Sequence, residues 1–149
     1  MRRTLILLTA AAVLLVAAPA ASACDARRTS GPVKHKPRTE RAPLILGDST
    51  MILAAPLLGR RGLEADAQGC RQFAAGVAML AQRKRAGRLP RVAILALGAN
   101  GAIGRGSMAR AVRVMGRDRI LGLVTPRQAA SSDATMRWEI GRASCRERV

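Results

Sequence analysis

The chain has 149 residues, a formal net charge of +17, and few aromatic side chains: no Tyr, one Phe and one Trp. A charge this basic is typical of nucleic-acid binders, but the chain lacks aromatic platforms on which bases could stack, and its arginines are scattered. We therefore expect one small domain with a solvated basic face, suited to an anionic cell envelope, and no nucleic-acid partner.

The N-terminus has the pattern of a secretory signal peptide over residues 1–23. Met1-Arg2-Arg3 is positively charged, Thr4–Val16 is an apolar run, and Ala21-Ser22-Ala23 fits the small-residue rule for cleavage. The apolar run is too short to span a bilayer comfortably, so no stable membrane span is expected after cleavage. The predicted location is outside the cell or in the cell envelope.

Three cysteines remain after this cleavage: Cys24, Cys70 and Cys145. An oxidising compartment permits a disulfide between Cys24 and Cys70, although their spacing does not demand one. Lipid attachment at Cys24 is a less favoured alternative, because Ala21 stands where such sites usually carry Leu. No zinc-ligand spacing is present, and neither a metal nor a cofactor is predicted.

Residues 24–42 are rich in Arg, Lys, Pro, Gly and Ser, which is typical of a disordered linker. The domain is predicted over residues 43–138, where apolar strands alternate with helical patterns. Strands are expected at Leu44–Leu46, Leu63–Ala67 (a more exposed one), Val92–Leu97 and Ile120–Val124. Helices are expected over Ser49–Leu58 with a kink or restart at Pro56, from Phe73 to a cap at Gly87, and from a capping Ser107 to Met115. Four such alternations predict an α/β protein with a three-layer, doubly wound parallel sheet.

Polar clusters follow three of the predicted strands: Gly47-Asp48-Ser49, Gln68-Gly69-Cys70 and Gly98-Ala99-Asn100. In doubly wound sheets, ligands bind beyond the carboxyl ends of the strands. Ser49 would project its hydroxyl there as a nucleophile. Its own N–H, a backbone N–H at Gly69 and the Asn100 amide could converge on one oxyanion. Asp48 is expected to orient its turn, and Arg71 to form a surface salt bridge rather than to bind an anionic substrate.

These motifs, in this order and strand context, resemble the SGNH or GDSL-type hydrolase superfamily over roughly residues 43–138. The stretches Gly69–Phe73, Leu89–Arg91 and Ala96–Asn100 look most like SGNH domains joined to bacterial membrane acyltransferases. The resemblance implies a flavodoxin-like fold and a serine esterase or O-acyltransferase for acyl esters, with cell-envelope polysaccharide as a candidate substrate. It makes Ser49 the nucleophile and Gly69 and Asn100 oxyanion residues, with Cys70 as an alternative match to the family glycine.

The sequence departs from the family at its end. The family completes its triad with Asp-x-x-His, which is absent here, and His35 lies in the predicted linker, where no base role is assigned to it. Residues 139–149 read like a translated sequencing adapter, so we interpret them as a non-native tail. The domain is then incomplete at the C-terminus, and Cys145 has no functional meaning.

Two other classes of function compete with this prediction. Gly98–Gly104 follows a buried strand and precedes a helix, as a dinucleotide phosphate loop does. Asp118, however, precedes the next strand instead of ending it, so it is poorly placed to reach a ribose. A non-catalytic module that binds envelope polymers would explain the charge and the export, but it leaves Ser49 and Asn100 without a role.

Overall fold

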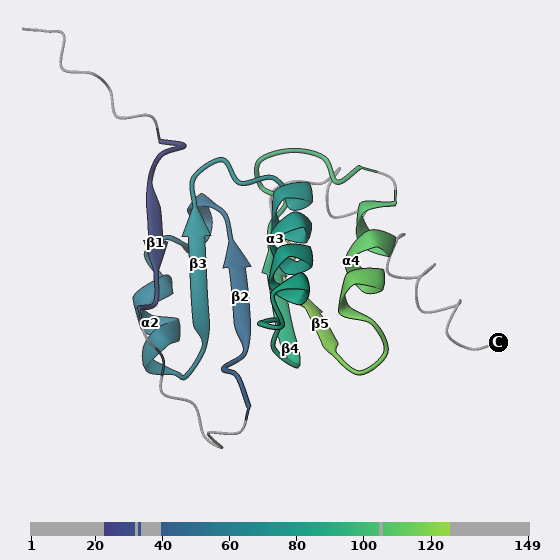
Figure 1. The fold of residues 1–149 in the computed structure, drawn as a ribbon. Coiled ribbons are helices and arrows are strands. Elements are labelled where there is room, and N and C mark those ends of the chain that lie inside the picture. The colour runs from purple at the N-terminus through teal and green to yellow at the C-terminus, as the bar shows by residue number, and fades with distance from the viewer. Residues whose placement is uncertain (1–22, 32, 34–39, 105, 126–149) are drawn as a thin grey trace, which may run out of the picture.

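The computed structural model describes residues 23–31, 33, 40–104 and 106–125 (Figure 1). Residues 1–22 of the predicted signal peptide, His35 and the predicted tail 139–149 lie outside the described residues. In chain order the elements are β1 (Arg27–Thr29), β2 (Leu44–Gly47), the 3-10 helix η1 (Ser49–Met51), α2 (Ala55–Arg60), β3 (Glu64–Gln68), α3 (Phe73–Arg85), β4 (Val92–Ala96), α4 (Ser107–Met115) and β5 (Ile120–Leu123).

The strands form one sheet in the order β1-β3-β2-β4-β5. Strand β1 is antiparallel to β3, and the other neighbours are parallel. Without β1, the strand order is β3-β2-β4-β5. The first parallel strand in the chain, β2, thus lies between the second, β3, and the third, β4, as in flavodoxin-like sheets. The chain therefore reverses its winding direction between β2 and β4. The predicted α/β class is confirmed, and the sheet is parallel as predicted except for β1, an antiparallel strand that was not expected.

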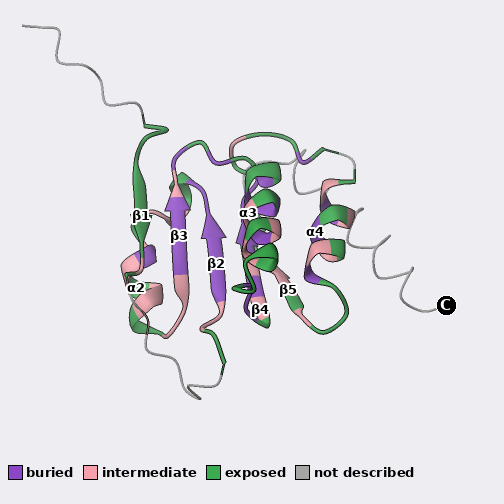
Figure 2. Ribbon diagram, viewed as in Figure 1, coloured by how far each residue is buried: buried purple, intermediate pink, exposed green. Residues whose placement is uncertain are grey.

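Strand β2 is buried along its whole length (Figure 2), and its successive side chains alternate between the two faces of the sheet. Leu44 and Leu46 belong to a cluster with the inner sides of α3 and α4, whereas Ile45 packs on the opposite face with Ala55 of α2. Helix α3 lies close to the sheet at Gly76, where a Cβ would collide with the Leu97 side chain. This packing fixes the strand ends from which the candidate site is built.

The helix boundaries follow local chemistry, with one correction. Pro56 stands in the first turn of α2, so the predicted restart occurs there, after the separate turn η1. Gly87, at a φ of 62°, follows α3 as the expected terminating glycine. Ser107 was expected to cap α4, but it is the first helical residue. Gly106 takes the capping position at a φ of 76°, without a side-chain hydrogen bond.

The expectation of a disordered linker over residues 24–42 is wrong for Arg27–Thr29, which form β1 at the edge of the sheet. The same strand overturns the prediction that Leu63–Ala67 is a more exposed strand. Strand β3 lies between β1 and β2, and its three central residues are buried. Ser30 continues the pairing, since its backbone N–H donates to the Ala65 carbonyl at 2.9 Å.

A disulfide joins Cys24 to Cys70, which are separated by 46 positions in sequence and whose Cα atoms lie 4.8 Å apart. Closing a loop of that length stabilises the folded state by about 4 kcal/mol through the entropy of the unfolded chain. The Cys24 sulfur cannot be lipidated while it forms this bond. Among the described residues, no helix is long and apolar enough to cross a membrane.

Candidate active site

The candidate site lies at the carboxyl ends of β2 and β4, where the winding direction reverses. Asp48, which is 1% exposed, links the turns that follow these two strands. One carboxylate oxygen, Oδ1, accepts hydrogen bonds from the Thr50 N–H at 3.0 Å and the Thr50 hydroxyl at 2.7 Å. The other, Oδ2, accepts from the Ala99 N–H at 3.3 Å. The Asp48 carboxylate therefore holds together the turns that carry Ser49 and Asn100.

Ser49 is the first residue of η1 and is exposed. Asp48 precedes it in an extended conformation, so the chain turns sharply from the buried strand into the 3-10 helix. Gly47 allows this turn to be tight, because a Cβ at that position would lie 2.5 Å from the Met51 side chain. The Ser49 side chain is thus accessible at the carboxyl ends of the parallel strands, where ligands of such folds bind.

Asn100 lies in the turn after β4. Its side-chain nitrogen, Nδ2, is buried and has no hydrogen-bond partner among the described residues. Its backbone carbonyl accepts a hydrogen bond from the Gln72 side chain at 2.6 Å, which ties the turn to the start of α3. A buried amide without a partner is rare, because it forgoes the hydrogen bonds that it would form in water.

Gly69 lies in the turn after β3, but its backbone N–H is engaged. It donates to the Ala26 carbonyl at 2.8 Å. A Cβ at Gly69 would collide with the Ala23 carbonyl, so a glycine is needed here for the close approach of the N-terminal segment. Its neighbour Cys70 has a φ of 54°, and it is the only non-glycine residue with positive φ in the described part of the chain.

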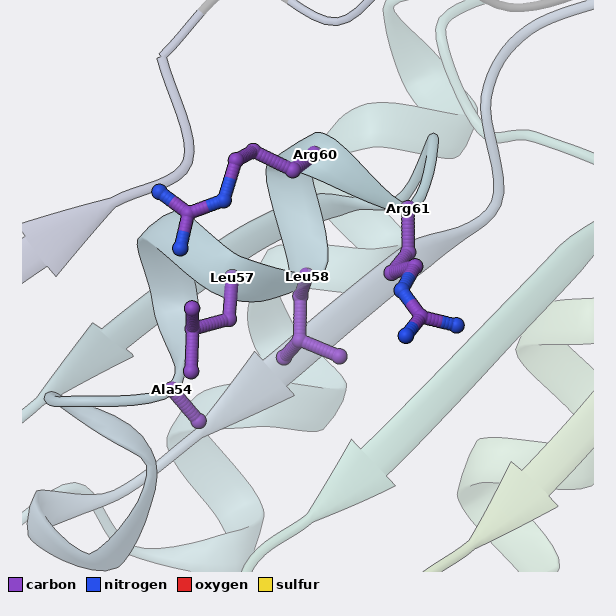
Figure 3. A pocket seen from close by; sticks show the side chains of 5 residues that line it. All are labelled: Ala54, Leu57, Leu58, Arg60 and Arg61. Atoms are coloured by element: carbon purple, nitrogen blue, oxygen red, sulfur yellow. The ribbon is translucent and has the colours of Figure 1, made fainter.

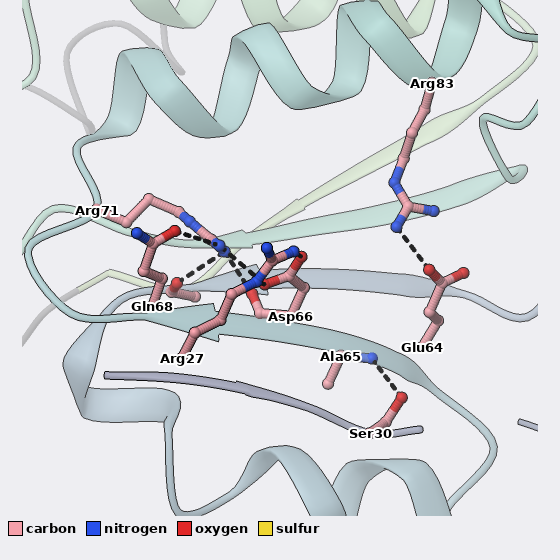
Figure 4. Close-up of polar contacts among 9 residues, drawn as sticks. Arg27, Ser30, Glu64, Ala65, Asp66, Gln68, Arg71 and Arg83 are labelled. Carbon is pink, nitrogen blue, oxygen red and sulfur yellow. Dashed lines mark hydrogen bonds and ion pairs between the residues drawn. The ribbon is translucent and has the colours of Figure 1, made fainter. Parts of the chain in front are cut away.

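Asp66, Arg71 and Arg27 form a charged cluster between this turn and the sheet (Figure 4). Arg71 is 6% exposed and Asp66 is 5% exposed, so the ion pair expected at the surface is buried. The Arg71 guanidinium donates to the Asp66 carboxylate at 2.8 Å and to the backbone carbonyls of Asp66 and Gly47 at 2.5 and 3.1 Å. It therefore fixes the turn after β3 against the turn that carries Ser49.

Burial alone would raise the pKa of Asp66, but hydrogen bonds from Arg27 and Arg71 outweigh it and lower that pKa. The same contact with Asp66 raises the pKa of Arg27. This cluster was not predicted from the sequence. The signal available in the sequence was Asp66, an acidic residue between two alanines in a strand that neighbours a fully buried strand. A carboxylate buried at such a position needs a cationic partner, so an arginine beside it could have been expected.

Two hollows lie on the surface near these elements. A cavity of about 60 Å³ at the strand ends is lined by Asp48, Thr50, Met51, Ala96, Leu97, Ala99 and Val124. A larger one, of about 480 Å³, is lined by residues of α2 and its two flanking positions: Ala54, Leu57, Leu58, Arg60 and Arg61. In Figure 3 the two guanidinium groups lie apart, on either side of the leucines. No carboxylate, imidazole or hydroxyl lines the larger cavity, whereas the smaller one is lined by Asp48 and Thr50, the two residues that flank Ser49 in the chain.

The described residues contain no group of three or more His, Cys, Asp or Glu side chains that could hold a metal ion. They also give little support to a dinucleotide site. Asp118 lies in the turn before β5, at the amino end of that strand. Because β4 and β5 are parallel, Asn100, which follows β4, lies at the opposite end of the strands. Helix α4 begins at Ser107, several residues beyond the polar turn at Asn100.

The architecture defined by these observations is an α/β sheet with a serine at the carboxyl end of its first parallel strand. Its fold is similar to that of the C-terminal catalytic domain of Streptococcus pneumoniae peptidoglycan O-acetyltransferase A (OatA), solved with a methylsulfonyl adduct, at a TM-score of 0.58 and 17% sequence identity. The match covers 66% of this chain and 61% of that domain. The resemblance to acyltransferase-associated SGNH domains is thus confirmed at the level of the fold. No protein-family model and no curated protein matches the chain.

Proposed function

We propose that this chain is the nucleophile-bearing part of an exported serine esterase or O-acyltransferase. The observation that carries the proposal is the buried Asn100 amide without a partner, in a turn that the Asp48 carboxylate joins to the turn of Ser49. A donor held in this way gains its missing hydrogen bond when negative charge develops on a substrate oxygen. Such a donor stabilises the transition state more than the ground-state carbonyl.

The reaction would proceed in two transfers. The Ser49 hydroxyl oxygen forms a bond to the acyl carbonyl carbon, and its proton passes to a base. Collapse of the tetrahedral intermediate breaks the ester C–O bond, and the alcohol leaves with that proton. Water in an esterase, or a hydroxyl of an acceptor in a transferase, then takes the acyl group from Ser49 by the same steps.

Three donors would stabilise the oxyanion. We assign two of them to the Ser49 N–H and the Asn100 side-chain amide. Because the Gly69 N–H is donated to the Ala26 carbonyl, we assign the third to the Cys70 N–H, one residue further along the same turn. Asp48 would act by orienting both flanking turns, since its two carboxylate oxygens are already engaged with Thr50 and Ala99.

The missing base is assigned to an Asp-x-x-His beyond Trp138. We propose that residues 139–149 are a non-native tail and that the natural continuation supplies the acid and histidine and completes a doubly wound, three-layer domain. Residues 1–23 would direct export. The similar domain belongs to a peptidoglycan O-acetyltransferase, and a net charge of +17 favours anionic surroundings, so we propose acyl esters of cell-envelope polysaccharide as the substrate class.

The test requires the extended protein, by which we mean this chain through Trp138 followed by the genomic sequence downstream of that codon. Ser49→Ala in the extended protein is expected to lower turnover of p-nitrophenyl acetate by at least about 10³-fold. Ser107→Ala, which removes a hydroxyl at the start of α4, is the matched control and should retain activity.

The chain alone, residues 24–149, is expected to be essentially inactive, because Ser49 is a weak nucleophile without a base. Full activity of the extended Ser49→Ala variant would refute the assignment of the nucleophile. Comparable Ser49-dependent turnover by the chain and by the extended protein would instead place the base within this chain, with His35 as the first residue to substitute.

A further inference from the structure

The N-terminal arm, residues 24–31, is fastened to the turn after β3 at several points. The Cys24–Cys70 disulfide joins them covalently, and the Gly69 N–H donates to the Ala26 carbonyl at 2.8 Å. Arg27 adds an ion pair to Asp66 at 2.6 Å, just before the turn. The arm is therefore part of the folded domain, and its contacts concentrate on one turn.

That turn contains an unusual backbone conformation at Cys70, whose φ is 54°. Only a few per cent of non-glycine residues have positive φ, and Cys is not among the types enriched there. Such conformations persist where the surrounding structure imposes them, and they cluster at functional sites. Here Cys70 is held on one side by its disulfide to Cys24 and on the other by Arg71, which is anchored to Asp66.

The turn is also fixed relative to the proposed nucleophile. Strands β2 and β3 are parallel neighbours with Gly47 opposite Ala67, so the residues that follow each strand leave the sheet at the same edge. The Arg71 guanidinium donates to the Gly47 carbonyl at 3.1 Å, two residues before Ser49. A shift of the turn at Cys70 would therefore change its position relative to Ser49.

We propose that the N-terminal arm is a positioning element of the active site, in which the Cys24–Cys70 disulfide holds the Cys70 backbone N–H in the orientation required for the oxyanion. This inference rests on the proposed function, because it assigns the arm a role in the same reaction. Cys24 acts through Cys70 and is a positioning residue, with no contact to the substrate. The arm thus does more than stabilise the fold, and it makes the activity depend on the oxidised state of this cysteine pair.

Two double variants of the extended protein separate positioning from stability. Cys24→Ser with Cys70→Ser removes the disulfide and keeps a Cβ at a position with positive φ. Cys24→Ser with Cys70→Gly also removes the disulfide, but glycine adopts positive φ without steric cost. Both variants lose the loop-closure contribution to stability, so their thermal unfolding serves as the internal control.

We expect the serine pair to lower kcat for p-nitrophenyl acetate by roughly 10- to 100-fold, since a displacement of about 1 Å near the reacting atoms has effects of that size. KM should stay within about twofold, because an oxyanion donor acts on the transition state. The glycine pair should recover most of the loss. An unchanged kcat in the serine pair, or an equal loss in both pairs, would overturn the proposal.

Amide hydrogen exchange distinguishes failure of this inference from failure of the proposed function. If the extended protein shows no Ser49-dependent turnover, the proposed function fails, but the hold of the arm on the turn can still be measured. The Gly69 amide should be protected in the parent, and its exchange should be at least about 10-fold faster in the serine pair. Equal exchange in both proteins would show that the disulfide does not fix the turn, which also overturns the inference.

Discussion

Two buried polar groups, one on β3 and one in the turn after β4, differ sharply in their partners. The Asp66 carboxylate is bound by Arg71 and Arg27, and Arg71 in turn satisfies two backbone carbonyls (Figure 4). The Asn100 amide nitrogen is also buried, yet it has no partner among the described residues. The first group follows the usual rule for buried charge, and the second departs from it.

The difference separates residues that hold the fold together from residues that we assign to the reaction. A buried donor without a partner costs about 1–3 kcal/mol of stability, so its retention calls for a compensating role. A carboxylate paired with two guanidinium groups needs no such explanation. We therefore expect substitutions in the Asp66 cluster to change mainly stability, and those at Asn100 to change mainly catalysis.

The largest expected effect on stability is that of Arg71→Met, which leaves the Asp66 carboxylate buried with one partner fewer. Breaking a buried ion pair typically costs about 3–5 kcal/mol. The loss should fall in the lower part of that range, because Arg27 still reaches the Asp66 carboxylate at 2.6 Å. Urea unfolding of the extended protein measures the change.

The matched control is Arg83→Met, which breaks the ion pair of Arg83 with Glu64 at the surface. That pair has a similar N–O distance, 2.6 Å, but its side chains are 22% and 40% exposed. Pairs of this kind contribute about 0–1 kcal/mol. Equal destabilisation by the two substitutions would contradict the distinction between the buried cluster and the surface.

Asn100→Ala tests the other half of the comparison. It should lower kcat by about 10²–10³-fold, the usual effect of removing one oxyanion donor, with little change in KM. The free energy of unfolding should not fall, because the substitution removes a buried donor without a partner and keeps the backbone carbonyl that Gln72 binds. A raised KM with unchanged kcat, or a clear loss of stability, would assign Asn100 to the fold or to substrate binding.

Much of the fold could be predicted because its signals are local in sequence. The apolar runs at Leu44–Leu46 and Val92–Leu97, the restart at Pro56 and the terminating Gly87 all act within a few residues. The polar turns that carry Ser49 and Asn100 could be placed together at the carboxyl ends of the strands, because each follows a strand directly in sequence and parallel strands end on the same side of the sheet.

The N-terminal arm could not be predicted in this way. Arg27, Arg28 and Thr29 have no apolar side chain among them, and all three are exposed, so their composition resembles that of a linker. Their place in the sheet depends on partners far along the chain: Asp66 for Arg27, and the disulfide of the nearby Cys24. The engagement of the Gly69 N–H follows from the same long-range contacts, which local patterns do not reveal.

The remaining prediction concerns pH and follows from the lowered pKa of Asp66. A carboxyl group that is more acidic in the folded than in the unfolded protein contributes stability that is fully present above its unfolded pKa, about 3.9. That contribution is lost as the pH falls through the lower pKa of the folded state, because protonation then removes the charge that Arg27 and Arg71 bind. Stability should therefore decrease with acidification below about pH 4, in addition to the effects of other carboxylates.

Asp66→Asn isolates the contribution of this one group. Asparagine keeps the shape and one acceptor oxygen but carries no titrating charge, so the variant should be less stable at neutral pH and should lose stability less steeply on acidification. The free energies of unfolding of parent and variant should then converge toward low pH, where Asp66 is neutral in both states of the parent. Parallel stability curves for the two proteins between neutral pH and pH 3 would mean that Asp66 titrates alike in the folded and unfolded protein. In that case the two arginines would not lower its pKa, and the contrast between Asp66 and Asn100 would rest on geometry alone.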